Sequence, residues 1–292
     1  MQSDVANLLY LTAAVLFIFG LKGLTHPRRA VRGNLISALG MLIAVVTALV
    51  SEAGLDWRVI LAGVVAGGCV GIFLALKTRM TAIPQVVALF NGFGGGASVL
   101  VAGAALVGGT GDAGSLRVLI STAAAVIIGA VTLLGSLVAF AKLAEVIRRS
   151  LSFPGQKIYN GVLAAGCIVS AILMVTAGGD LFWFWVMAAL AAVLGVLLVI
   201  PIGGADMPVV IAALNAYSGL AACGTGFVLG NNVLVIAGSL VGTSGLILTR
   251  IMCRAMNRSF TNVIFGVPLG LSLIHISEPT RHDSGSRMPS SA

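Results

Sequence analysis

The stretch that decides the fold is GGADMPVVIAALNAYSGLAACGTGFVLGNNVLVIAGSLVGTSGLILTRIMCRAMNRSF, residues 203–260. It holds two apolar spans of about 20 residues, the length a helix needs to cross a hydrocarbon core of roughly 30 Å. One amide, Asn215, interrupts the first span and Asp206 precedes it, while Arg254 and Arg258 end and follow the second. We therefore predict two consecutive membrane helices with polar residues at defined depths.

The whole chain has the composition of a membrane protein. Hydrophobic residues make up 59% of it and charged residues 9%, with a mean hydropathy of +1.10, which leaves too little polar surface for a water-soluble globule of 292 residues. Apolar runs recur at about 5–23, 34–51, 57–76, 83–107, 116–141, 159–177, 180–200, 207–229 and 232–251. The runs are continuous rather than alternating, which excludes a β-barrel. We predict an all-α integral membrane bundle of about nine transmembrane helices.

Basic residues predict the orientation of this bundle, because Lys and Arg are retained in short cytoplasmic loops. They gather after the first, third, fifth and ninth spans: Lys22, Arg28, Arg29, Arg32, Lys77, Arg79, Lys142, Arg148, Arg149, Lys157, Arg250, Arg254 and Arg258. We expect a periplasmic N-terminus and a cytoplasmic C-terminus in a bacterial inner membrane. The formal net charge of +8 is therefore an orientation signal, and nucleic acid is not an expected partner.

Small residues predict how the helices pack. Glycines three or four residues apart let helix backbones approach closely in lipid, and they occur at Gly63, Gly67 and Gly71, at Gly92 and Gly96, and at Gly238 and Gly242. The four cysteines form no CxxC pair, so we interpret them as packing residues rather than metal ligands. The run GFGGGA at 92–97 fits a dinucleotide pattern, but no strand precedes it, so we expect no nucleotide site there.

Polar residues in four spans lie at similar distances from the basic ends of their helices. At about 1.5 Å of rise per residue, Asn91 lies about 15 Å, Asn215 about 13 Å, Ser244 about 12 Å and Ser136 about 8 Å from that end. Such side chains can simply bond neighbouring helices, at about 0.6 kcal/mol each on average. A shared layer of amides and hydroxyls can also hold a short file of water, so we predict a hydrated site.

No Asp, Glu, Lys or His lies well inside the predicted spans. An amide does not titrate near neutral pH. A proton relay through this chain would therefore run through water held by polar side chains, or would borrow a titrating group from another subunit. We expect Asp206, two residues before Pro208, to cap its helix with its carboxylate.

Several motifs resemble the beta subunit of proton-translocating NAD(P) transhydrogenase. GGADMPVV from Gly203, LNAYSG from Leu214 and IMCRAMNRSF from Ile251 resemble its last two membrane helices. FGLKGLTHPRRAVRGN from Phe19 and GSLVAFAKL from Gly135 extend the resemblance over residues 5–266, and it stops near Gly270. Beta subunits of this family continue into a soluble NADP(H)-binding domain that we do not find in this sequence.

The resemblance implies a membrane domain at residues 1–266 that couples proton translocation to Re/Si-specific hydride transfer. NAD(H) would lie on a partner alpha subunit and NADP(H) on the beta domain beyond the bundle, in a complex with a second beta subunit. The implied proton path comprises Asn91, Ser136, Asn215, Ser218, Ser244 and Gly245, and the residues implied to couple the bundle to the nucleotide domain are Asp206, Arg254 and Arg258. Residues 267–292 look like adaptor read-through in place of that domain; a disordered native terminus is the alternative.

This sequence departs from the family pattern at Asn91, where many relatives have the histidine treated as the proton carrier. The departure implies that a histidine on a membrane helix of the alpha subunit titrates instead. Two other functions stay open: a secondary transporter or channel for a small solute, and a structural subunit whose amides only join helices. No proline interrupts a span, which weighs against the broken helices typical of transporter sites.

Overall fold

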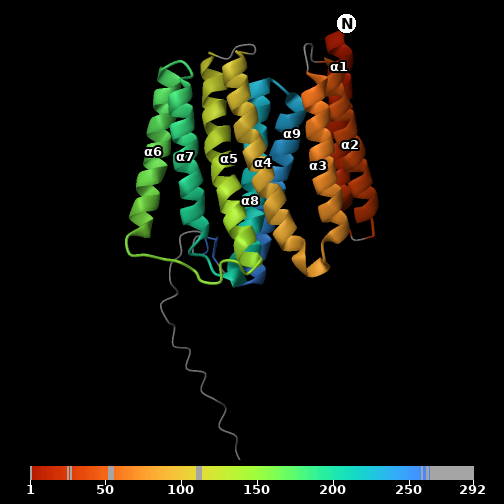
Figure 1. The fold of residues 1–292 in the computed structure, drawn as a ribbon. Helices are drawn as coiled ribbons and strands as arrows, with labels where there is room; N and C mark the ends of the chain where they lie inside the picture. Colours follow the sequence, from red (N-terminus) through yellow and green to blue (C-terminus); the bar gives the residue numbers. More distant parts are fainter. Residues whose placement is uncertain are drawn as a thin grey trace, which may run out of the picture.

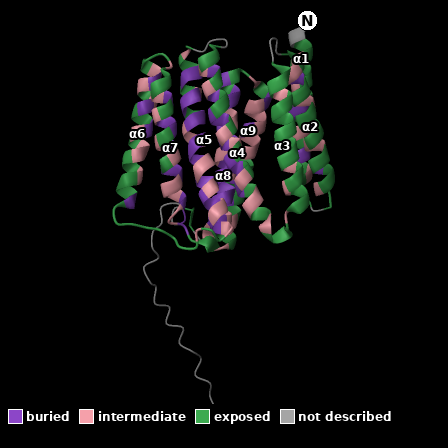
Figure 2. Ribbon diagram, in the orientation of Figure 1, coloured by how far each residue is buried: buried purple, intermediate pink, exposed green. Residues whose placement is uncertain are grey.

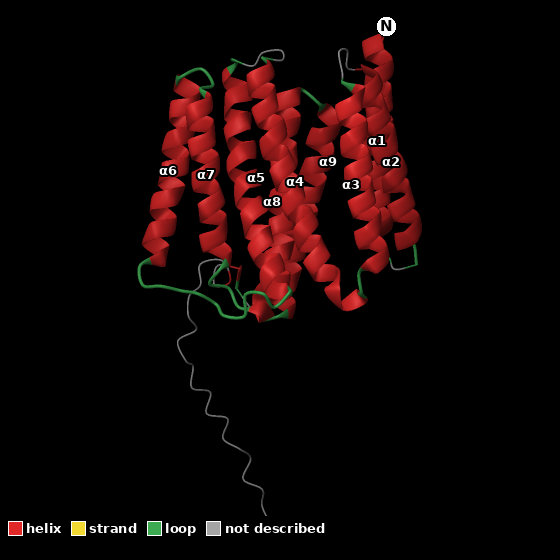
Figure 3. Cartoon of the chain, viewed as in Figure 1, coloured by secondary structure: helices red, strands yellow, loops and turns green. Residues whose placement is uncertain are grey.

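A computed structural model of the chain describes residues 2–24, 26, 28–51, 56–109, 114–257, 259–260 and 263. Within them the chain is helical and has no strand (Figures 1 and 3). The elements are α1 (Gln2–Leu24), α2 (Ala30–Ser51), α3 (Trp57–Lys77), η1 (Met80–Ala82), α4 (Ile83–Gly108), α5 (Leu116–Leu143), α6 (Gln156–Thr176), α7 (Leu181–Val199), η2 (Gly204–Asp206), α8 (Met207–Leu229) and α9 (Asn232–Ala255). Nine described helices are long and apolar enough to cross a membrane, so the predicted helical membrane fold is confirmed. The predicted tail, 267–292, lies outside the described residues.

Local chemistry sets the ends of several helices. Four of them start at a side chain whose oxygen accepts a backbone N–H of the first turn: Asp56 from Arg58, Ser115 from Val118, Asp180 from Phe182 and Asn231 from Leu234. Pro84 and Pro208 occupy the first turns of α4 and α8, where a missing N–H costs nothing. Because proline is confined to these places in the described helices, α4, α5, α8 and α9 run without interruption.

Charge separates the two ends of the bundle. Successive helices run in opposite directions, so the α1–α2, α3–α4, α5–α6 and α7–α8 connections and the end of α9 lie at one end (Figure 1). That end, called the basic end below, carries every described Lys and Arg except Arg58 and Arg117. Asp4, Asp56 and Asp180 lie at the opposite end.

The core is centred on α5 and α8, which hold the most buried residues (Figure 2). Helix α5 packs against α4, α7 and α8, while α9 packs on α8 and α6 on α7. One apolar cluster joins α4 to α7 around Phe184 and Met187, and a second joins α8 to its neighbours around Met207 and Val209. This arrangement brings the predicted polar residues of α4, α5 and α8 into the centre of the molecule.

The predicted glycine packing is confirmed at α4 and α9. A methyl group added to Gly238 would meet the backbone of Cys223, and one added to Gly92 would lie 3.3 Å from the carbonyl oxygen of Leu133. The prediction for Gly63, Gly67 and Gly71 is wrong within this chain, since none has a neighbouring atom within 4 Å. Helix α3 has no buried residue and makes no extensive contact with another described helix. A regular glycine spacing makes a face smooth but does not supply the helix that covers it.

The four cysteines are free thiols. Cys167 and Cys253 are buried in the core, as expected of packing residues, and Cys223 is partly buried. Cys69 on α3 is exposed, so the packing interpretation does not hold for it within this chain.

Candidate functional site

The α4–α8 contact contains a buried amide. The side-chain nitrogen of Asn91, a residue that is 7% exposed, donates a hydrogen bond of 3.3 Å to the carbonyl oxygen of Ile211 on α8. Ile211 lies one helical turn before Asn215, so the bond holds Asn91 beside the Asn215 segment. Each asparagine lies eight residues from the basic end of its helix, or about 12 Å. The structure thus places both amides at the same level.

Asn215 and Ser218 share the face of α8 that contacts α4. Residues 211, 215 and 218 follow the spacing of one helical face, and a methyl group added to Gly94 of α4 would lie 2.6 Å from the Ser218 hydroxyl oxygen. Both side chains are only half-buried in this chain. Gly94 therefore leaves room for a hydroxyl at this contact, and part of the polar face stays open to a neighbour.

Ser136 supplies an unsatisfied hydroxyl on the other side of α4. Its side chain is fully buried, and the hydroxyl oxygen has no hydrogen-bond partner among the described residues. It lies next to Gly92, where an added methyl group would lie 3.3 Å from the Ser136 β-carbon. Since buried polar atoms normally have a partner, this hydroxyl is a candidate ligand for a buried water.

Ser244 and Gly245 are neighbours in α9, but one is exposed and the other is buried. Gly245 is buried, and a methyl group added there would lie 2.7 Å from the backbone nitrogen of Ala216, next to Asn215. Ser244 is exposed, and its hydroxyl donates to the carbonyl of Val241 in its own helix. Within this chain Ser244 therefore does not join the buried polar group.

Two helix contacts near the middle of α4 and α8 are too close to admit water. A methyl group added to Gly95 of α4 would lie 2.5 Å from the carbonyl oxygen of Gly129 on α5. One added to Gly219 of α8 would lie 2.8 Å from the carbonyl oxygen of Gly238 on α9. Water or another polar group can therefore be held only beside these contacts, at the partly open face that carries Asn215 and Ser218.

The predicted coupling residues lie at the basic end. The expected capping role of Asp206 is wrong: it precedes α8, but its side chain makes no capping bond. Because η2 runs directly into α8, Asp206 has φ −91° and ψ −1° instead of the extended backbone of a capping residue. Arg254 is exposed in the last turn of α9, and Arg258 lies outside the described residues.

Comparison with known proteins identifies the family. Residues 6–286 match the family described as NAD(P) transhydrogenase beta subunit. The chain is 45% identical over 264 residues to NAD(P) transhydrogenase subunit beta of Rhodospirillum rubrum, covering 88% of this chain and 57% of the relative. The subunit beta sequence of Rhodospirillum rubrum strain ATCC 11170 gives the same values. This chain belongs to the NAD(P) transhydrogenase beta subunit family.

Membership of the transhydrogenase beta family, with its helices able to span a membrane, indicates a multi-pass membrane protein. The chain spans 57% of the length of the curated relatives it matches. The described part of this beta-family chain has no cluster of three or more His, Cys, Asp or Glu that would hold a metal. The glycines at 92–97 lie inside α4 against α5, so they do not fit a dinucleotide.

Lys142 is a polar residue of this beta-family chain whose burial the sequence did not reveal. The predicted span ends at residue 141 and leaves Lys142 in a loop, but α5 extends to Leu143 and Lys142 is 8% exposed. Its ammonium donates to the carbonyls of Ile200 and Ile202, just beyond α7, the latter at 2.6 Å. In the motif GSLVAFAKL, Lys142 follows Ser136 by six residues. This short distance from a residue predicted to lie inside the span was the one sequence signal that Lys142 is buried.

Proposed function

We propose that residues 1–266 form the membrane domain of the beta subunit of a proton-translocating NAD(P) transhydrogenase. The domain couples proton movement across the membrane to hydride transfer between NAD(H) and NADP(H). Family membership supports the enzyme class. The observation that carries the proton path is the Asn91 bond to Ile211 beside Asn215, with Ser136 and Ser218 close by.

Protons cross by way of water held at these amides and hydroxyls, because neither asparagine nor serine titrates near neutral pH. A histidine on a membrane helix of the alpha subunit supplies the titrating group. The half-buried Asn215 and Ser218 support this arrangement, since a partner helix laid on that face of α8 would complete the site.

Coupling runs through the basic end, which faces the bacterial cytoplasm. Proton occupancy shifts the bundle between two states, and Asp206, Arg254 and Arg258 transmit the difference to an NADP(H)-binding domain. Such coupling requires that the two states differ in affinity for the domain or its nucleotide. NAD(H) binds the alpha subunit, and two alpha–beta pairs form the complex.

Co-expression with a family alpha subunit tests this proposal. The bundle is joined to an NADP(H)-binding domain of this family, reconstituted in vesicles, and assayed for hydride transfer and proton uptake together. We expect proton uptake that depends on both nucleotides. Uptake of a small solute without nucleotides would favour the transporter alternative, and an assembled, inactive complex would contradict the proposal.

A further inference from the structure

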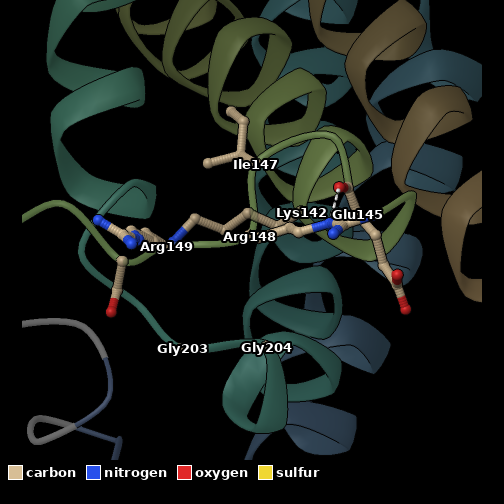
Figure 4. Close-up of a pocket in the computed structure, with 8 residues that line it drawn as sticks. Lys142, Glu145, Ile147, Arg148, Arg149, Gly203 and Gly204 are labelled. Carbon is tan, nitrogen blue, oxygen red and sulfur yellow. Dashed lines mark hydrogen bonds between the residues drawn. The ribbon is translucent and has the colours of Figure 1, made fainter.

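A cavity of about 460 Å³ opens at the basic end between the α5–α6 and α7–α8 connections. Its lining residues come from both connections and the end of α5: Lys142, Glu145, Ile147, Arg148, Arg149, Ser150, Gly203 and Gly204 (Figure 4). The cavity is separate from the Asn91 and Asn215 group, which lies about 12 Å further along α4 and α8. It is therefore a second polar feature that the proposed proton path does not use.

The cavity has an excess of positive charge. Lys142, Arg148 and Arg149 line it, and none of the three has a carboxylate within ion-pair distance in the described part of the chain. Glu145 is the one acid in the lining, and its carboxylate points away from Arg149 (Figure 4). The backbone carbonyl of Glu145, rather than its carboxylate, accepts the Arg148 Nε–H at 3.3 Å. The guanidinium groups of Arg148 and Arg149 and the buried ammonium of Lys142 thus line one cavity, and Glu145 is the one negative charge in its lining.

Lys142 distinguishes the cavity from a patch of surface charge, because it contributes a buried ammonium group whose position is fixed by hydrogen bonds. Its side chain is 92% buried, and two carbonyls hold its ammonium in place. An ammonium group has three N–H donors, so one remains for a ligand. An arginine fork offers planar, paired donors suited to phosphate oxygens. Together these groups present several donors in a cavity whose lining has one acid, Glu145.

The position of the cavity fits a phosphate at the membrane surface. Lys142 is the next-to-last residue of a span, so the cavity lies at the level where a bilayer's headgroups begin. A methyl group added to Gly203 or Gly204 would meet nothing within 4 Å, which leaves the wall opposite the cations open. We propose that Lys142, Arg148 and Arg149 bind a phosphate group in this cavity, supplied either by an anionic phospholipid headgroup or by a phosphate-bearing solute.

Gly203 allows a test that keeps all three cations. Its φ of −70° and ψ of 156° suit any residue, and its side-chain direction is open, so Gly203→Asp places a carboxylate at the cavity without backbone strain. Gly203→Asn is the matched neutral control. The purified 292-residue chain is stripped of lipid in an uncharged detergent and titrated with short-chain phosphatidylglycerol, with phosphatidylcholine as reference. Binding is followed by native mass spectrometry.

We expect wild type to bind phosphatidylglycerol at least tenfold more tightly than Gly203→Asp does, and Gly203→Asn to stay within threefold of wild type. Arg149→Gln should weaken binding at least fivefold. Lys157→Gln, which removes the same charge from the neighbouring first turn of α6 outside the cavity, should leave binding unchanged.

Inorganic phosphate and pyrophosphate, added as competitors, distinguish the two sources. Displacement of the lipid at millimolar concentration would assign the site to a phosphate-bearing solute, and persistence of the lipid would assign it to a headgroup. The proposal is overturned if wild type shows no preference over phosphatidylcholine and binds neither competitor. It is also overturned if Lys157→Gln costs as much affinity as Arg149→Gln, because the effect would then be diffuse surface charge.

Discussion

Lys142 shows how one buried charge can fix a connection between helices. Its ammonium bonds the carbonyls of Ile200 and Ile202, which begin the segment leading into α8. Lys142→Met removes both donors and leaves two acceptors unsatisfied in a buried place, at about 1–3 kcal/mol each. We expect a clearly lower thermal unfolding temperature in detergent for Lys142→Met. Lys157→Met, on the exposed start of α6, should not change it, and equal effects of the two variants would argue against the buried role.

Substitution of Asn91 tests whether this residue supports the proton path or carries the proton itself. Its bond to Ile211 is a membrane hydrogen bond, worth about 0.6 kcal/mol on average, so Asn91→Ala should slow coupled transhydrogenation about threefold. Removal of every intramembrane histidine from the alpha subunit should abolish proton pumping. Paired assays of hydride transfer and proton uptake check both. Pumping that survives without those histidines but disappears in Asn91→Ala would refute the assignment.

At the scale of elements, glycines decide whether two helices touch. A methyl group at Gly219 would meet the backbone of Gly238 and Gly242, which cannot yield as a flexible side chain would. Gly219→Ala should therefore destabilise the α8–α9 pair by about 1–3 kcal/mol. Gly67→Ala on α3 is the matched control, since its added methyl group meets open space. Thermal unfolding of the two variants in detergent compares them, and similar stabilities would contradict the α8–α9 packing.

The sequence predicted the positions of the helices better than the contacts that their polar side chains make. Hydropathy placed all nine described spans, because 20 apolar residues in a row have few other structures available in lipid. It did not predict that η2 runs into α8 and turns Asp206 away from capping, since a short 3-10 turn has no strong pattern. Ser244 shared the predicted depth of Asn215 but lies on an exposed face. The depth of a residue along a span follows from counting residues, whereas the direction in which its side chain points depends on how the helix packs against its neighbours.

At the scale of the whole molecule, the segregation of charge predicts which end faces the cytoplasm. Single cysteines are introduced at Ser150, at the basic end, and at Gly114, at the opposite end, with the four native cysteines replaced by serine. In intact cells a membrane-impermeant maleimide should label Gly114→Cys and not Ser150→Cys, and inverted vesicles should reverse the pattern. The opposite labelling would contradict the proposed orientation.

The packing of α3 could not have been predicted from this chain alone. Its glycine spacing predicts close packing, yet no described helix lies within 4 Å of those glycines. Helices α1 and α2 pack on each other, and α1 contacts α9 only lightly. The physical reason is that lipid exerts no hydrophobic force between helices, so an isolated chain does not determine every neighbour.

The most direct test of the central claim is Asn215→Leu in the complete complex, with proton uptake and hydride transfer measured in the same vesicles. Asn160→Leu is the control, because it removes a half-buried amide from α6, outside the proposed path. We predict that Asn215→Leu loses proton uptake and coupled hydride transfer together, at least tenfold, while Asn160→Leu retains both. Normal pumping in Asn215→Leu would contradict a proton path along the α4–α8 contact.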